Sequence, residues 1–296
     1  MRDGISISFN ELVKLRFAAN RIRLHSQHAL AHQLAGQQRA LVRGRGVDFE
    51  EVRIYQAGDE IRNMDWRVTA RTGKPHTKIF REERERPVLA LVDYRTNMLF
   101  GTRVVFKSVL AAQTASMLSW AAYQQGYPVG GTILTSDEII YLPPLGRQRG
   151  ILTLLKSLAE YSEHVHQHTS QQADDSLLTA SLQRLHQTAP TGSLVFLISD
   201  FNHWTEQAEV YLSQLAKRHD VRCYFIYDQL EATPPPPNRY ALSNGLHTLL
   251  LDTRIKKVAD SYAQQFQRRF AKIKQLMTKY GIRFTPLATH QTILDK

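Results

Sequence analysis

The chain has 296 residues, of which 43% are apolar, enough for one large domain with an appendage or for two small domains. No stretch approaches 18 uninterrupted apolar residues and the N-terminus lacks an apolar signal core, so we expect neither a membrane span nor secretion. The single cysteine, Cys223, excludes an intrachain disulfide, and we expect a cytoplasmic protein with this cysteine in its core.

The net charge of +11 is concentrated at the two ends of the chain. Residues 1–46 carry eight basic and two acidic side chains, and residues 254–296 carry ten basic and two acidic ones. Such ends are suited to contact nucleic acid, an anionic membrane face or an acidic protein. The simpler interpretation is a set of solvated helix faces, and that is the one we prefer.

Residues 1–41 are predicted to form an N-terminal helical arm. Apolar residues recur at helical spacing from Leu12 to Leu24, and a second helical piece is expected over residues 29–41. The pattern does not distinguish a docking arm from an amphipathic surface helix.

Residues 42–86 are predicted to form a small β-rich unit that is dense in opposite charges. A turn is expected around Gly58 and a strand over residues 77–80. Gly44 and Gly46 alternate with arginines, but their spacing matches neither known phosphate-binding glycine motif, so we expect a simple turn there. Asp59 and Asp65 could in principle form an acid–base pair. Residues 47–86 hold nine acidic and nine basic side chains, which favours a charge-paired scaffold instead.

From Val88 onward, apolar runs that indicate buried strands alternate with helical patterns. The run Val88–Val92 stops at Asp93, and the run over residues 194–199 stops at Asp200. Further strands are predicted over residues 129–134, 139–142 (ended by two prolines), 221–227, 247–251 and 283–286, with 129–142 as the one hairpin. Helices are predicted over residues 102–125, 150–161, 176–186, 205–217 and 255–280. This alternation predicts an α/β fold with a mostly parallel sheet flanked by helices.

Two further segments have weak binding signals. His164, His166 and His168 alternate in a polar stretch and could bind a metal, but we expect an ordinary loop. The four prolines of residues 233–238 predict a stiff loop spacer.

Longer motifs give the chain a family resemblance. Two buried strands ending in aspartate, with Asp-x-x-x-Asn after the first, resemble a von Willebrand factor A-type domain. The string RGRGVDFEEVRIYQAGDEIRNMDWRVTARTGKPHTKIFREERE, running into LALVD, resembles the bacterial family called Domain of Unknown Function 58. The resemblance covers about residues 40–230. Its motif residues in the small unit are Arg53, Tyr55, Gly58, Asp59, Arg62, Asp65, Trp66, Arg71, Lys78 and Glu83.

The resemblance implies a von Willebrand factor A-like (Rossmann-like) domain over residues 87–296, preceded by the β-rich unit and the arm. It also implies a non-enzymatic adaptor that works with a MoxR-type AAA+ ATPase in chaperone-like maturation or remodelling of client proteins. The chain lacks a GxSxG elbow, a Walker motif and an HExxH motif, so we expect no enzyme. A nucleic-acid-binding protein that uses the basic ends is the alternative, and peripheral membrane contact through those ends is a further one.

The type A domain's metal site maps onto Asp93, Arg95, Asn97, Ser176 and Asp200. Mg²⁺ requires oxygen ligands, and Arg95 supplies none. A +1 charge about 4 Å from a +2 ion costs on the order of 8 kcal/mol at an effective dielectric constant near 20. We therefore expect no bound metal and a salt bridge in which Arg95 lies across Asp93 and Asp200, with Mg²⁺ at these two aspartates as the alternative. The five residues would then form a surface for partner proteins.

Overall fold

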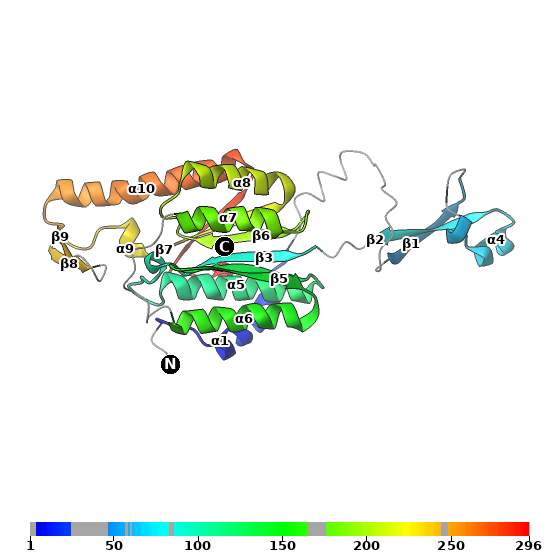
Figure 1. Ribbon diagram of the computed structural model, residues 1–296, viewed down its shortest axis with the longest axis horizontal. Coiled ribbons are helices and arrows are strands. Elements are labelled where there is room, and N and C mark those ends of the chain that lie inside the picture. Colours follow the sequence, from blue (N-terminus) through cyan, green and yellow to red (C-terminus); the bar gives the residue numbers. More distant parts are fainter. Residues whose placement is uncertain are drawn as a thin grey trace. The chain divides into compact units, whose positions relative to one another are not determined.

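A computed structural model describes residues 4–24, 47–56, 59, 61–82, 86–164, 176–243 and 248–295. The chain divides into two compact units, which are described separately (Figure 1). Unit 1 comprises Met1–Ala29 and Arg86–Lys296, and unit 2 comprises Leu30–Glu85. These boundaries differ from the predicted ones because the first helices belong to unit 1. Ile7, Leu12, Ala19 and Leu24 are buried in its core rather than exposed on an arm.

Unit 1 is built on a six-stranded sheet. Its strands lie in the order β10 (Arg283–Ala288), β7 (Asp220–Tyr227), β6 (Leu194–Ser199), β3 (Val88–Asp93), β4 (Val129–Leu134) and β5 (Ile139–Leu145). Only the β4–β5 pair is antiparallel. Numbered along the chain within this sheet, the order is 3-2-1-4-5-6, that of a doubly wound Rossmann-like fold. The predicted von Willebrand factor A-like α/β fold is therefore confirmed.

Helices cover both faces of this sheet (Figure 1). On one face lie α1 (Phe9–Lys14), α5 (Lys107–Gln124) and α6 (Arg147–His164), and on the other lie α7 (Ser176–Thr188), α8 (Glu206–Arg218) and α10 (Lys256–Lys279). Successive side chains of β3 point to opposite faces. Val88, Ala90 and Val92 join the first core cluster, and Leu89 and Leu91 join the second. Among the described helices, none combines the length and apolar content of a membrane span.

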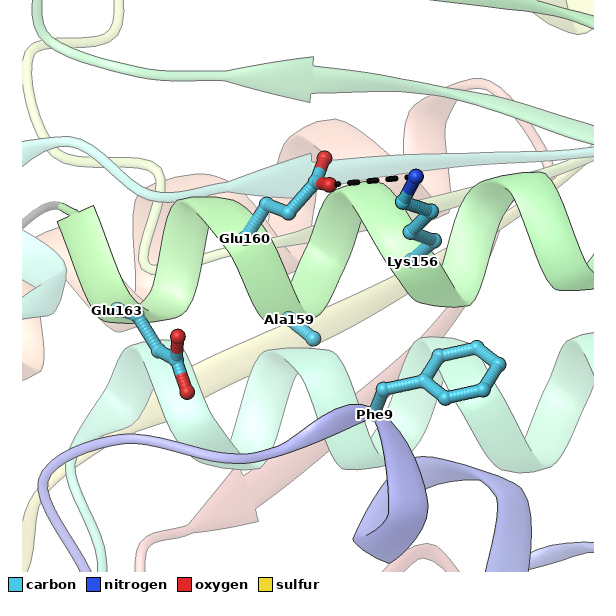
Figure 2. A pocket seen from close by; sticks show the side chains of 5 residues that line it. All are labelled: Phe9, Lys156, Ala159, Glu160 and Glu163. Atoms are coloured by element: carbon cyan, nitrogen blue, oxygen red, sulfur yellow. Dashed lines mark ion pairs between the residues drawn. The ribbon is translucent and has the colours of Figure 1, made fainter.

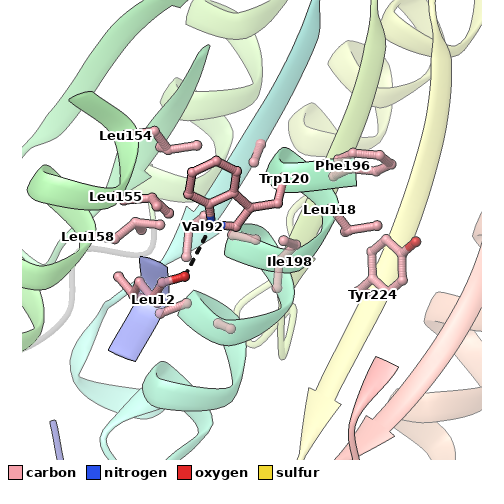
Figure 3. Close-up of a cluster of buried hydrophobic side chains, with 14 of the residues drawn as sticks. Leu12, Val92, Leu118, Trp120, Leu154, Leu155, Leu158, Phe196, Ile198 and Tyr224 are labelled. Atoms are coloured by element: carbon pink, nitrogen blue, oxygen red, sulfur yellow. Dashed lines mark hydrogen bonds between the residues drawn. The ribbon is translucent and has the colours of Figure 1, made fainter. Parts of the chain in front are cut away.

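The N-terminal segment is fastened to α5 by polar as well as apolar contacts. The carbonyl oxygen of Leu12 accepts hydrogen bonds from Trp120 Nε1 at 3.2 Å and from Ser116 Oγ at 2.9 Å. Figure 3 shows Leu12 beside Trp120, with leucines of α6 packed against the same cluster. A short helix, α2 (Arg16–Ala19), continues this segment along α5.

Three predicted elements differ from the structure. β5 continues through Pro143 and Pro144 to Leu145, because an edge strand tolerates missing N–H donors. The strand predicted over 247–251 is present from residue 248 as β9 (Thr248–Asp252), which pairs with β8 (Arg239–Ser243) in a separate two-stranded sheet. The chain thus has a second hairpin in unit 1. The helix predicted from residue 102 begins only at Lys107, after η2 (Thr96–Met98) and a loop.

Unit 2 contains the antiparallel pair β1 (Val47–Ile54) and β2 (His76–Glu82), and β2 includes the strand predicted over 77–80. Between them lie two elements that we did not predict, η1 (Ile61–Asn63) and α4 (Trp66–Thr72). Asp65 caps α4 by accepting hydrogen bonds from two backbone amides, and Gly73 ends it in a left-handed conformation with φ of 69°.

Several predictions lie outside the described residues. They concern the helical piece 29–41, the glycines Gly44 and Gly46, the motif residues Gly58 and Glu83, and the histidines His166 and His168.

Candidate functional site at the carboxyl edge of the sheet

The ends of β3 and β6 define the place where a ligand is expected in this fold. These two strands are neighbours, and the strand order reverses between them. In doubly wound sheets, ligands lie just beyond the carboxyl ends of strands at such a switch point. Asp93 is the last residue of β3 and Asp200 directly follows β6. Both predicted aspartates therefore reach the expected position.

Asp93 is paired within its own loop. Arg95 donates from Nε to Asp93 Oδ1 at 3.0 Å and from Nη2 to Oδ2 at 2.8 Å, while its backbone amide donates to Oδ1 at 3.0 Å. Ser199 Oγ donates to Oδ2 at 2.6 Å. The side chains of Asp93 and Arg95 are both 0% exposed. This is a bidentate salt bridge in a dry environment, the geometry that an arginine fork favours.

Asp200 is paired with a lysine from a distant part of the chain. Lys107, the first residue of α5, donates from Nζ to Asp200 Oδ2 at 2.8 Å and to Glu231 Oε1 at 2.9 Å. Asn97 Nδ2 and the backbone amide of Asn202 donate to Asp200 Oδ1 at 2.6 and 3.0 Å. Glu231 lies in α9 (Gln229–Ala232), and Arg269 of α10 approaches it at 3.5 Å. The lysine thus joins β6, α5 and α9 through one ammonium group.

The protonation of this network follows from its geometry. Burial by itself raises the pKa of Asp200, but the adjacent Lys107 ammonium, together with Arg269 and the backbone amide of Asn202, outweighs burial and the pKa is lowered. Burial likewise acts to lower the pKa of Lys107, yet the carboxylates of Asp200 and Glu231 reverse this and the pKa is raised. Both partners are therefore charged at neutral pH, and each charge is balanced inside the protein.

A third aspartate ends the next strand of the sheet. Asp228 follows β7, is 0% exposed, and accepts hydrogen bonds from the backbone amide and hydroxyl of Thr102 at 3.0 and 2.6 Å. Thr289 Oγ1 donates to it at 2.5 Å, and the Leu230 amide at 2.9 Å. Burial raises its pKa, but these hydrogen bonds outweigh burial and lower it. Asp228 therefore fixes the loop after η2 to the ends of β7 and β10.

The predicted site residues are only partly brought together. Asn97 contacts Asp200, and Arg95 contacts Asp93, but Arg95 does not bridge both aspartates because Lys107 holds Asp200. Ser176 is the exposed first residue of α7. One expectation is corrected: Asp93, Arg95 and Asp200 are each 0% exposed, so they do not form a surface themselves. They can act on a partner only by shaping the loops above them.

A magnesium ion does not fit this arrangement. All four carboxylate oxygens of Asp93 and Asp200 accept hydrogen bonds, and three of them contact the side-chain cation of Arg95 or Lys107. Among the described residues, no group of three or more Asp, Glu, His or Cys side chains could hold a metal ion. One buried oxygen, Asn97 Oδ1, has no hydrogen-bond partner in the described part of the chain. A single amide oxygen is far short of the six oxygens that Mg²⁺ requires.

Four residues that matter here were not anticipated: Ser199, Lys107, Asp228 and Glu231. Asp228 had a clear signal, because it follows a buried apolar run as Asp93 and Asp200 do. Glu231 also had one, since Asp228-x-x-Glu231 is a capping box and the structure forms it. Lys107 had no signal, because a lysine at the start of a helix is ordinarily solvated.

The motif residues of unit 2 form the charge-paired scaffold in part. Arg53 contacts Asp59 at 2.8 Å, and Lys78 contacts Asp65 at 3.6 Å. Backbone amides of α4 together with Lys78 hold the pKa of Asp65 below its ordinary value, although burial opposes them. Trp66 is 66% exposed, and Arg62 and Arg71 are also exposed. The two aspartates are thus used in holding the unit together.

Figure 2 shows a separate pocket between α1 and α6. It is lined by Phe9, Lys156, Ala159, Glu160 and Glu163, and Lys156 contacts Glu160 at 3.7 Å. None of its lining residues belongs to the carboxyl-edge network, and Lys156 and Glu160 are paired along one helix.

Two solved structures resemble the fold only distantly. An aerotolerance-related membrane protein from Bacteroides fragilis, carrying multiple mutations to serines, matches with a TM-score of 0.41 and 10% identity, covering 68% of this chain and 91% of that one. Conserved hypothetical protein BatB from Bacteroides thetaiotaomicron matches with a TM-score of 0.37 and 12% identity, covering 66% and 98%. The fold assignment rests on the strand order and not on these two likenesses.

Sequence relatives are closer. Uncharacterized proteins Rv1480 of Mycobacterium tuberculosis and Mb1516 of Mycobacterium bovis are each 27% identical over 228 residues, covering 75% of this chain and 68% of theirs. The model of one family, described as protein of unknown function DUF58, matches residues 51–272. Since this match spans well over half of the sequence, the chain belongs to the DUF58 family.

Proposed function

We propose that this protein is a non-enzymatic, metal-independent interaction adaptor that works in the cytoplasm. It would act with a MoxR-type AAA+ ATPase in chaperone-like maturation or remodelling of other proteins. The ATPase partnership rests on the family resemblance of the unit 2 motif and the aspartate-ended strands. The structure bears on a narrower question, which is what the carboxyl edge of the sheet can do.

The main observation behind the proposal is that hydrogen bonds and ion pairs within the protein already occupy the carboxylates at the switch point. Reaction chemistry needs a group that can attack a substrate or take its proton, and metal-dependent recognition needs free carboxylate oxygens. Asp93 and Asp200 offer neither, because fixed cations and hydrogen-bond donors occupy their oxygens. The site therefore supports a rigid platform for protein contacts better than it supports catalysis.

Exposed residues of the same loops are the contacts that we expect a partner to use. The loop between η2 and α5 leaves Val104 61% exposed, next to exposed Arg103. This loop is fixed at both ends: Thr102 is bonded to Asp228, and the amide of Phe106 donates to the carbonyl of Gly4 at 2.8 Å. A pre-ordered loop loses little conformational entropy on binding, which favours recognition.

Co-purification tests this proposal. The chain is co-produced with a MoxR-type ATPase encoded in the same genome, and the amount of ATPase retained on the purified chain is measured with and without ATP. Val104→Asp, combined with Arg103→Glu, is expected to abolish retention. Val210→Asp is the matched control, because Val210 is 51% exposed on α8. Retention that is unchanged by the loop variant, or absent for the wild type, would remove the proposal.

The nucleic-acid alternative has one observation in its favour. Helix α10 exposes Lys256, Lys257, Arg268, Lys272 and Lys274. Binding driven by phosphate contacts must weaken steeply as salt rises. A double-stranded DNA probe that binds with the same affinity at low and at physiological salt, or does not bind, would exclude this function.

A further inference from the structure

Unit 2 exposes three large apolar side chains that its own fold does not use. Trp66 is 66% exposed, Ile61 is 64% exposed and Ile54 is 54% exposed. Scattered apolar residues are normal on protein surfaces, but an exposed tryptophan on a small unit that also exposes two isoleucines suits an interface. None of the three contributes to the charge pairs that hold this unit together.

Hydrogen bonds bring the three segments that carry these side chains to one end of the unit. Ile54 lies opposite His76 in the β1–β2 pair. The carbonyl of His76 accepts a hydrogen bond at 2.8 Å from the amide of Asp65, the residue before Trp66. Met64 forms a β-bridge with Thr77, which places η1, and with it Ile61, beside the same strand. The segments that carry the exposed apolar residues therefore meet at the start of β2.

The charges at this end are arranged unevenly. Asp59 pairs with Arg53, and Asp65 pairs with Lys78 and with two amides of α4. Four basic side chains remain exposed, and none of them takes part in an ion pair with a described residue: Arg62, Arg67, Arg71 and Lys74. Arg67 and Arg71 lie one turn apart on α4, next to Trp66. Among the described motif residues, Asp59 and Asp65 thus have structural roles, whereas Arg62 and Arg71 are exposed.

We propose that these residues form a docking surface for an acidic protein segment that carries an apolar side chain. The Trp66 surface, as we name it, consists of Ile54, Ile61, Arg62, Trp66, Arg67, Arg71 and Lys74. Trp66 supplies the apolar anchor and the arginines supply bidentate donors for carboxylates. Tryptophan and arginine are the residue types that most often dominate the binding energy of protein interfaces.

Nucleic acid fits this surface less well. Proteins that bind phosphate backbones carry a strong excess of positive charge, whereas residues 47–86 hold nine basic and nine acidic side chains. Aliphatic Ile54 and Ile61 offer no stacking platform to bases, but they extend the apolar contact of Trp66 with a peptide. The kind of apolar residue favours a protein partner.

This docking surface is independent of the proposed function, because it lies in unit 2 and not at the carboxyl edge of unit 1. Its failure would leave the adaptor proposal intact, and loss of the ATPase contact would leave this surface intact. Together they would give the chain two separate binding surfaces, as an adaptor between two proteins requires.

Peptide selection on the full chain is the test. A library of random twelve-residue peptides displayed on phage is selected on the immobilised chain, and the most enriched peptide is synthesised with a fluorescent label. We expect enriched peptides to combine aspartate or glutamate with leucine or an aromatic residue. Binding measured by anisotropy should weaken about tenfold for Trp66→Ala and for Arg67→Glu with Arg71→Glu. Enrichment of basic or neutral peptides, or no enrichment, would overturn the proposal.

The control matches the change in charge at another place. Arg268→Glu with Lys272→Glu alters the net charge equally, and both residues are exposed on α10 in unit 1. This variant should bind the peptide as the wild type does, while an equal loss would show that only net charge matters and would overturn the proposal. A labelled 20-nucleotide poly-thymidine is the competitor, and displacement of the peptide by it at physiological salt would assign the surface to nucleic acid instead.

Discussion

Three buried aspartates at one edge of the six-stranded sheet and one buried histidine at the other differ in how the protein compensates them. At the carboxyl edge, Asp93, Asp200 and Asp228 are each 0% exposed, and each accepts several hydrogen bonds. At the amino edge, His219 is 1% exposed and neither of its ring nitrogens has a hydrogen-bond partner in the described part of the chain. The three aspartates are therefore stable as charged carboxylates, because donors surround them. The His219 imidazole has no such partner among the described residues, so burial favours its neutral form.

The carboxyl edge also shows a difference between a local and a distant pair. Arg95 reaches Asp93 across two residues, so their pair fixes one loop. Lys107 joins Asp200 and Glu231 from three separate elements. Removal of the lysine takes a cation from two carboxylates, of which Glu231 keeps Arg269 at 3.5 Å, while removal of the arginine takes a cation from one. The expected costs therefore follow the order lysine, arginine, histidine.

The largest effect is expected for Lys107→Met. Loss of the cation paired with a buried carboxylate costs about 3–5 kcal/mol, and Asp200 is fully buried. The free energy of unfolding, measured in urea, should fall by this amount. Lys156→Met is the control, since Lys156 is 73% exposed and its pair with Glu160 should contribute no more than about 0.5 kcal/mol. Similar losses for both lysines would contradict the assigned network.

Arg95→Met should cost less, about 2–4 kcal/mol. Arg95 compensates one carboxylate and Lys107 compensates two. Asp93 would also still accept hydrogen bonds from Ser199 Oγ and from the backbone amide of residue 95. Urea unfolding of Arg95→Met, of Ser199→Ala and of the double variant gives the coupling between the two donors. If the two single losses simply add, the donors do not share Asp93 as the structure indicates.

His219 at the amino edge should make stability depend on pH in a range where Asp200 at the carboxyl edge does not. Burial, with Arg218 and His186, lowers the pKa of His219 to about 4 from an ordinary value of 6.5. The unfolded chain then binds the proton more tightly, so stability falls as pH drops from about 6.5 towards 4. The lowered pKa of Asp200 acts only below its ordinary 3.8, because its stabilisation is complete above that value.

The histidine contribution is about 1–2 kcal/mol between pH 7 and pH 5. Melting temperatures of the wild type and His219→Gln across this range give the measurement. Between pH 7 and pH 5 the melting temperature of the wild type should fall more than that of the variant. Above pH 7 the two melting temperatures should change with pH in the same way. Parallel pH profiles would show that His219 is not held neutral by burial.

The same contrast between local and distant contacts explains which parts of the fold and site the sequence predicts. Strands β4 and β6 were predicted with their observed ends, because buried apolar runs bounded by polar residues are local signals. Asp93, Asp200 and Asn97 were located correctly because they follow such runs. The partner of Asp200 was not found, since only the folded arrangement brings the start of α5 to the end of β6. Helix α4 was missed because its seven residues carry no apolar stripe.

The smallest effect, and the one that separates this site from a metal-dependent one, is that of magnesium. A site that bound Mg²⁺ with a dissociation constant near 50 µM would gain about 2.7 kcal/mol from about 5 mM Mg²⁺, which raises the melting temperature by several degrees. We expect no shift for the wild type, because Arg95 and Lys107 already neutralise Asp93 and Asp200. Replacing both cations, as in Arg95→Ser with Lys107→Ser, should leave the carboxylates uncompensated and make the melting temperature rise with Mg²⁺. A shift in the wild type would show that an ion can displace the internal cations, and no shift in the double variant would show that more than charge excludes it.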